Sequence, residues 1–124
     1  MDKGPNNERQ RGADLEERTF QFAQRVRSLT RKLPTNPTNS EDVPQLIRSS
    51  GSVAANYLEA NDSLGKKDFL MRLRIARKEA KEARLFLRLL DCQEPETNKE
   101  RSSLAQEALE IKLILSAILQ KSGA

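Results

Sequence analysis

The fold is decided by residues 66–92, which read KKDFLMRLRIARKEAKEARLFLRLLDC. Apolar residues recur through this stretch at alternating steps of four and three, the spacing of a helix buried along one side. The repeating positions are Phe69, Leu73, Ala76, Ala80, Ala83, Leu87 and Leu90. Other apolar residues, such as Ile75 and Leu85, fall outside this repeat. A helix that is apolar beyond one stripe needs more than one neighbour, so we expect residues 66–92 to pack among several helices.

Three more segments have helical periodicity, which predicts helices over about residues 14–33, 42–63 and 97–121. The links between these segments are short. The sequence therefore predicts an all-α fold, an antiparallel up-down-up-down four-helix bundle spanning residues 14–122. Residues 1–13 are polar, and we expect them to form a disordered leader.

The helix ends are predicted from residues with known capping preferences. The first helix should stop at Pro34, because proline cannot continue a helix. The second should begin with Ser40 or Asp42 as its cap, and Gly65 should supply the left-handed residue that ends it. The spacing of residues 97–100, Thr-Asn-Lys-Glu, predicts a capping box at the start of the fourth.

The composition provides little of the chemistry used in active sites. The chain has 124 residues and no histidine, the usual general base and metal ligand. Its one cysteine, Cys92, has neither a histidine nor a helix N-terminus beside it to activate the thiol. Glu79 and Glu82 could share a metal only with the Glu-x-x-His motifs of di-metal bundles, which are absent. We therefore expect no enzyme activity, no catalytic residue, no cofactor and no metal.

No apolar run is long enough to span a membrane, and the polar N-terminus does not resemble a signal peptide. A single cysteine also excludes a disulfide scaffold. We therefore expect a cytoplasmic protein with no membrane partner.

A polar stripe on the second predicted helix is a candidate for an architectural site. Arg48, Ser52, Asn56 and Glu59 follow one another at steps of four, four and three. The residues around them are small, rather than the Lys and Glu that are typical of an ordinary solvated face. We expect a network in which Arg48 and Asn56 approach Glu79 or Glu82, and Lys78 approaches Glu59, so that it selects the register of the two helices. A ligand site or plain exposure are the alternatives. The residues of this predicted network are Arg48, Ser52, Asn56, Glu59, Lys78, Glu79 and Glu82.

Positive charge is concentrated on the third predicted helix, where residues 66–93 hold nine Lys or Arg against four Asp or Glu. With a sequence pI of about 9.5, this distribution is typical of a nucleic-acid-binding surface. The alternative is that the basic face pairs with the acidic second or fourth helix, in the same subunit or the next. The candidate nucleic-acid-binding residues are Arg25, Arg31 and Lys32 on the first helix and Arg77, Lys81, Arg84 and Arg88 on the third.

Residues 48–60, RSSGSVAANYLEA, resemble the signature of the four-helix-bundle proteins encoded in intervening sequences of 23S rRNA genes. That signature has Arg-Ser, Ser-Ile/Val, Asn and Glu-Gly/Ala in this order. The matches continue through the third helix at Ser63, Asp68, Phe69, Leu73, Ile75, Ala76, Lys78, Glu79 and Glu82. Two positions depart from the family pattern, since Ala60 replaces the commoner Gly and Ala54 stands where many members have Pro.

The resemblance implies a four-helix bundle that assembles as a homopentamer and has a role in binding RNA or DNA. Its relatives include the accessory protein of diversity-generating retroelements, which partners a reverse transcriptase, so a reverse transcriptase is one implied partner. From the residues and the resemblance together, we expect a non-enzymatic homo-oligomer that binds nucleic acid through helices one and three. The alternative is a protein-interaction scaffold or accessory subunit without direct nucleic-acid binding.

Overall fold

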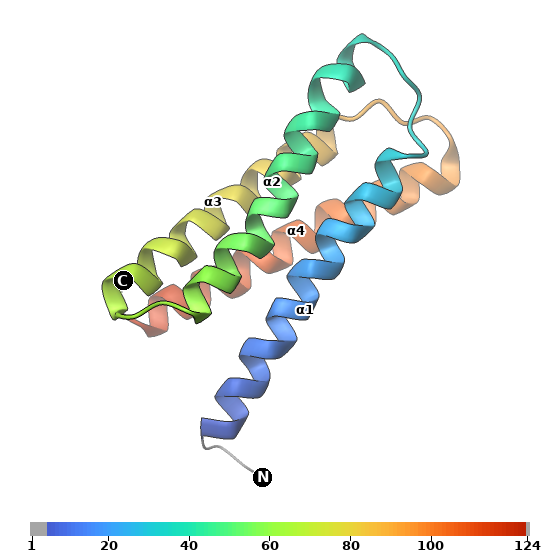
Figure 1. The fold of residues 1–124 in the computed structure, drawn as a ribbon. Helices are drawn as coiled ribbons and strands as arrows, with labels where there is room; N and C mark the ends of the chain where they lie inside the picture. Colours follow the sequence, from blue (N-terminus) through green and yellow to red (C-terminus); the bar gives the residue numbers. More distant parts are fainter. Residues whose placement is uncertain (1–4, 124) are drawn as a thin grey trace.

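The computed structural model describes residues 5–123, and the chain forms four α-helices over that range. They are α1 (Pro5–Thr30), α2 (Pro37–Asn61), α3 (Lys66–Leu89) and α4 (Pro95–Lys121). Consecutive helices are antiparallel, and α4 also packs on α1 (Figure 1). The predicted all-α four-helix bundle is confirmed.

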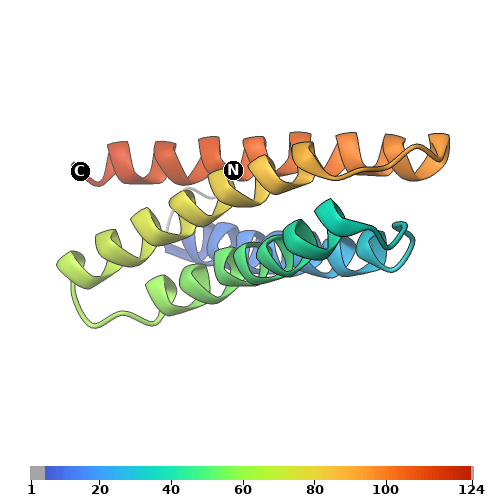
Figure 2. The same cartoon turned by 90° about the horizontal axis from the view of Figure 1, so that it is seen from above.

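The order of the helices around the bundle determines which surfaces lie opposite each other. Each helix contacts its neighbours in the order α1, α2, α3, α4, and α1 closes the circle. Within the described residues, the backbones of α1 and α3 do not come close to each other, and neither do those of α2 and α4. The second view shows α3 crossing between α4 and α2 (Figure 2). The side formed by α1 and α2 is therefore opposite the side formed by α3 and α4.

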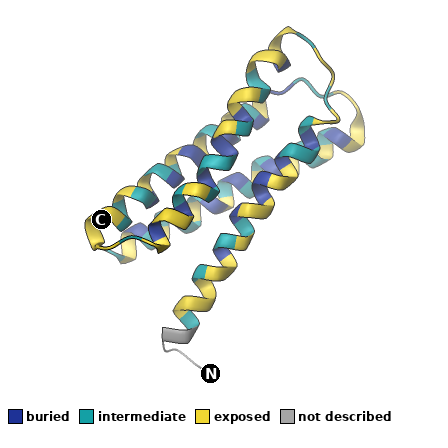
Figure 3. Cartoon of the chain, in the orientation of Figure 1, coloured by how far each residue is buried: buried dark blue, intermediate teal, exposed yellow. Residues whose placement is uncertain are grey.

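The core is built from the stripes that the sequence predicts, and the buried positions line the inner sides of all four helices (Figure 3). On α3 the seam contains Leu73, Ala76, Ala80, Ala83 and Leu87, all with no exposed surface. Small alanines on α3 let its neighbours approach closely, while leucines and Phe22 fill the remaining space. None of the helices in residues 5–123 is long and apolar enough to cross a membrane.

The first helix begins earlier than the sequence predicts, at Pro5 rather than Asp14, and it ends at Thr30 rather than Leu33. Residues 5–13 of the predicted leader are helical, and residues 1–4 lie outside the described residues. No apolar stripe indicates this extension, because its contacts are polar or small. Gln10 donates a hydrogen bond to Asp14 one turn later, at 2.9 Å, and Gly12 lies beside Tyr57 and Asn61 of α2.

The second helix also begins earlier than predicted. Its cap is Asn36, whose side-chain oxygen accepts a hydrogen bond from the Asn39 backbone N–H, so neither Ser40 nor Asp42 caps it. Pro37 occupies the first turn, where its missing N–H costs nothing. Gly65 is not a left-handed stop, because its φ of −162° is extended and it is the residue before α3.

The predicted capping box at residues 97–100 is wrong. Helix α4 starts at Pro95, and the carboxylate of Glu94 accepts hydrogen bonds from the backbone N–H groups of Glu96 and Thr97. The Thr97 hydroxyl donates to the same carboxylate instead of capping the helix. Helix α3 ends at Leu89, short of the predicted Cys92.

Two loops are joined at one end of the bundle by Asn39, a buried amide. Its Nδ2 donates to the carbonyl oxygens of Pro34 and Asp91, each at 3.0 Å, and its Oδ1 accepts from the Asp91 N–H at 2.9 Å. Asn36 adds a bond to the Asp91 carboxylate. The α1–α2 and α3–α4 loops are therefore held together at this end.

Candidate nucleic-acid interface

Helix α3 carries different chemistry on its two flanks. The positions just before the buried seam face α2 and include Arg72, Glu79 and Glu82, which bond to α2 side chains. The positions just after the seam are all basic and recur at steps of three and four. We call these five residues together with Lys112 of α4 the basic strip, which consists of Arg74, Arg77, Lys81, Arg84, Arg88 and Lys112.

The α3 part of the basic strip follows one side of the helix for about 21 Å, at 1.5 Å rise per residue. Lys81, Arg84 and Arg88 line a shallow groove of about 160 Å³ between α3 and α4, with Lys112 on its other wall. Ala80, Leu85, Ala108 and Leu109 complete the lining, which contains no carboxylate. Arg77 bonds to a neutral partner, the Ser116 hydroxyl of α4, at 3.5 Å. Within residues 5–123, no member of the strip forms an ion pair.

Two other basic residues have a different environment, because they pair with carboxylates of α4. Arg18 of α1 makes a two-pronged contact with Glu107, at 2.7 and 2.9 Å, and also reaches Glu110. Lys32, just after the end of α1, pairs with Glu100 at 3.0 Å. The hydrogen bonds to Glu107 raise the pKa of Arg18 above its ordinary value. Among the described residues, the carboxylates of α4 thus pair with Arg18 and Lys32 and not with the cations of the basic strip.

The predicted nucleic-acid residues therefore fall into two groups that α4 separates. Arg77, Lys81, Arg84 and Arg88 lie together in the basic strip. Arg25 of α1 is exposed, as are Arg31 and Lys32 just after the end of α1. Lys32 is paired, and Arg25 donates to the Ser103 hydroxyl at 3.3 Å. Two members of the strip were not predicted: Arg74 continues it along α3 at helical spacing, and Lys112 adds a cation from α4.

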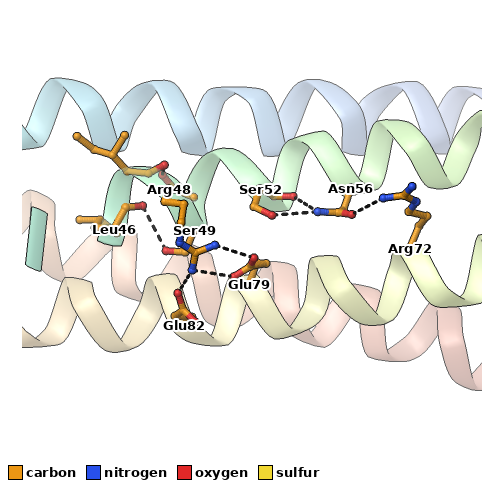
Figure 4. Close-up of polar contacts among 10 residues, drawn as sticks. Leu46, Arg48, Ser49, Ser52, Asn56, Arg72, Glu79 and Glu82 are labelled. Carbon is orange, nitrogen blue, oxygen red and sulfur yellow. Dashed lines mark hydrogen bonds and ion pairs between the residues drawn. The ribbon is translucent and has the colours of Figure 1, made fainter. Parts of the chain in front are cut away.

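The polar network between α2 and α3 is present in part (Figure 4). Arg48 bonds to Glu79 at 3.0 Å and also pairs with Glu82, as the sequence predicts. Glu79 is buried, whereas about half of the Arg48 side chain is exposed. The hydrogen bond to Glu79 is the main cause of the raised pKa of Arg48.

Asn56 lies in a second group rather than beside the two glutamates. Its Nδ2 donates to the backbone oxygen and hydroxyl of Ser52, and its Oδ1 accepts from Arg72 at 3.3 Å (Figure 4). Arg72 is not among the residues of the predicted network. Glu59 and Lys78 are exposed and form no ion pair with each other or with other described residues. The other side chains of the network bond to the opposite helix or to their own, so these bonds hold α2 and α3 together.

Few features of the described residues are suited to catalysis. No group of three or more potential metal ligands occurs within residues 5–123. Cys92 is free and lines a pocket of about 530 Å³ beside the joined loops. Burial raises the pKa of its thiol, which makes it a weaker nucleophile at neutral pH.

The chain is similar in sequence and in structure to proteins of one family. The family model described as 23S rRNA-intervening sequence protein matches residues 13–117. A crystal structure from Bacteroides thetaiotaomicron, described as a protein of unknown function from the S23 ribosomal protein family, is 28% identical. It superimposes with a TM-score of 0.70 over 85% of this chain and 97% of that one. No curated protein is detectably similar to the chain.

Proposed function

Because the chain belongs to the 23S rRNA-intervening sequence protein family, we propose that it is a non-enzymatic protein that binds RNA or DNA through the basic strip. The observation that carries this proposal is that the six cations of the strip lie together along α3 and one edge of α4, and that none of them forms an ion pair among residues 5–123. Unpaired guanidinium and ammonium groups are free to contact phosphates. The binding surface proposed is therefore centred on α3 and one edge of α4. Arg25 and Arg31, which also form no ion pair among residues 5–123, are separated from it by α4.

The chemistry of the strip supports recognition of phosphates rather than bases. The groove between α3 and α4 is lined by cations, alanine and leucine, and by none of the five aromatic residues of the chain. Without an aromatic platform, bases cannot stack on the surface, and the groove has no amide side chain to pair with adenine. We expect similar affinity for RNA and DNA of any sequence and a steep dependence on salt.

A salt series with fluorescence anisotropy on labelled RNA and DNA duplexes tests this proposal. Arg84→Glu/Arg88→Glu should weaken binding and lower the slope of log affinity against log salt by about two, roughly one for each lost cation. Lys66→Glu/Lys67→Glu changes the same charge at exposed positions outside the strip and is the matched control. Equal losses in the two variants, or no binding of the unmodified protein at low salt, would contradict the proposal.

We also propose that the protein self-associates, with the pentamer that the family resemblance implies as the expected state. Seven large apolar side chains of the described residues are substantially exposed, which is many for a 14.0 kDa chain. Sedimentation equilibrium at micromolar concentration measures the subunit number directly. A monomer under these conditions would refute self-association and leave nucleic-acid binding to be judged separately.

A protein-interaction scaffold is the second candidate. Leu85 and Leu89 of α3 and Leu113 of α4 are about half exposed near the strip, and apolar surface adds nothing to phosphate binding. A partner protein would use both the leucines and the cations. Capture of one defined acidic protein that survives nuclease treatment would favour this candidate.

A further inference from the structure

Two opposite sides of the bundle expose apolar side chains amid charges of opposite sign. The α1/α2 face exposes Phe20 and Leu58, which are 52% and 51% exposed. The α3/α4 face exposes Leu85, Leu89 and Leu113 beside the basic strip. Because the helices contact one another in circular order, these faces lie on opposite sides of the molecule.

Contacts between α1 and α2 show that Phe20 and Leu58 lie close to the same level. Asn61 of α2 donates to Glu16 of α1 at 2.8 Å, and the Arg27 guanidinium of α1 lies against Gly51 of α2. The helices are antiparallel, so a step forward along α1 corresponds to a step back along α2. Phe20, one turn after Glu16, is therefore beside Leu58, about one turn before Asn61.

The surroundings of Phe20 and Leu58 are acidic. Glu16 and Glu17 precede Phe20 by about one turn, and Glu59 and Asp62 follow Leu58 on α2. Within the described residues none of these four carboxylates forms an ion pair. Two cations lie nearby. The Nη1 of Arg27 donates to the Ala23 carbonyl, and Arg9 lines a hollow together with Glu16 and Asn61. The face thus has a surplus of negative charge around its apolar centre.

We infer that the α1/α2 face of one copy covers the α3/α4 face of the next copy. This inference rests on the proposed self-association and names its two surfaces. Each surface supplies exposed apolar side chains and unpaired charges, and the two sets of charges are complementary. Two different faces in contact make a head-to-tail arrangement, which continues from copy to copy until it closes as a ring.

The same arrangement makes self-association and nucleic-acid binding compete. A neighbouring copy placed on the α3/α4 face covers Lys81, Arg84 and Arg88, the cations of the groove. Phosphates of the nucleic acid and carboxylates of the neighbouring copy then compete for the same cations. Nucleic acid should therefore displace the neighbour from any strip that it occupies.

Charge reversal on each face, followed by sedimentation velocity, tests the inference. Glu17→Lys/Glu59→Lys reverses charge on the α1/α2 face, and Arg84→Glu/Arg88→Glu reverses it on the α3/α4 face. Each variant alone should self-associate at least about tenfold more weakly than the unmodified protein. An equimolar mixture should recover association in alternating copies, because a reversed acidic face pairs with a reversed basic one and the two native faces still match. A ring of five cannot alternate, so the recovered species should be open chains or rings with an even number of subunits.

The controls separate this inference from the proposals on which it rests. Glu41→Lys/Glu96→Lys makes the same charge change at exposed positions away from Phe20 and Leu58 and should leave assembly intact. Circular dichroism should report unchanged helix content for every variant. The α1/α2 variant keeps the whole basic strip, so it should bind duplex RNA at least as well as the unmodified protein.

Assembly that survives both reversals, or an equimolar mixture that stays monomeric, would overturn the pairing of faces while leaving self-association in place. A monomeric unmodified protein would overturn the assembly itself. Duplex RNA should reduce the subunit number of the unmodified protein. A complex that keeps its full subunit number with RNA bound would overturn the competition.

Discussion

At the scale of single residues, the buried Asn39 amide connects two loops. It is 3% exposed, its Nδ2 donates to a carbonyl of each loop, and its Oδ1 accepts from the backbone of one of them. Its partners are backbone groups of Pro34 and Asp91, which lose these hydrogen bonds when the amide is removed. An unpaired buried polar group costs more than the net value of the bond that it replaces.

Asn39→Ala should therefore lower the free energy of unfolding by about 2–4 kcal/mol. Chemical denaturation measures this change. Ser40→Ala is the matched control, since Ser40 is exposed in the same helical turn and should change stability by less than about 0.5 kcal/mol. Equal effects of the two substitutions would show that the amide does not join the loops.

The residue scale also shows what side-chain spacing could predict. Arg48 and Glu79 were paired correctly because both positions follow from helical periodicity once two helices are known to pack. Asn56 was placed wrongly and Arg72 was missed, because long side chains choose among rotamers that the spacing does not distinguish. The ion pair of Lys32 with Glu100 could not be predicted, because it depends on how α1 and α4 pack, and no local sequence pattern contains that information.

At the scale of elements, the bodies of the four helices were predictable and their ends were not. Apolar stripes define a helix only where it touches the core, so the polar residues 5–13 gave no signal although they are helical. At the start of α4, two capping arrangements were compatible with the sequence, and Glu94 provides the cap instead of Thr97.

The Glu94 cap makes the stability of α4 depend on pH. Hydrogen bonds from Thr97 and Glu96 to the carboxylate hold the pKa of Glu94 below its ordinary value of 4.5. The unfolded chain therefore takes up this proton at a higher pH than the folded chain. The stabilisation is present above about pH 4.5 and is lost as pH falls through the lower, folded-state value.

Glu94→Gln should accordingly lower the melting temperature at pH 7 by a small amount, and the difference from the unmodified protein should shrink at pH 3. Thermal denaturation followed by circular dichroism at both pH values provides the measurement. Glu96→Gln is the control, because Glu96 accepts no side-chain hydrogen bond within the described residues. A difference that is constant between pH 7 and pH 3 would exclude the charged cap.

At the scale of the whole molecule, the two ends of the bundle are held unequally. Asn39 joins the loops at one end, and Arg101 of α4 also bonds there to the Leu87 carbonyl at 3.2 Å. At the other end the N-terminal part of α1 diverges from the remaining helices (Figure 1). An open cleft of about 630 Å³ lies there, with Leu15, Phe69 and Ile118 among its lining residues.

Rates of amide hydrogen exchange should differ between the start of α1 and the core in the same way. Amides of residues 7–13 should exchange by local opening, orders of magnitude faster than those of the α3 seam, which need global unfolding. Mass spectrometry of peptides from a deuterium time course distinguishes the two. Equal protection of α1 residues 7–13 and the α3 seam would mean that the first turns of α1 are held as firmly as the core.

The division of charge between the two sides of the bundle has one more consequence for the molecule. Residues 40–64, which include most of α2, hold four Asp or Glu against one Lys or Arg, whereas residues 66–93 hold nine Lys or Arg against four Asp or Glu. The protein therefore carries an electric dipole across its short axis, in addition to its net charge of +4. In the field of a polyanion this dipole exerts a torque that turns the α3 side forward before contact, so that more encounters are productive. Added salt should then lower the association rate constant for nucleic acid more than it raises the dissociation rate constant.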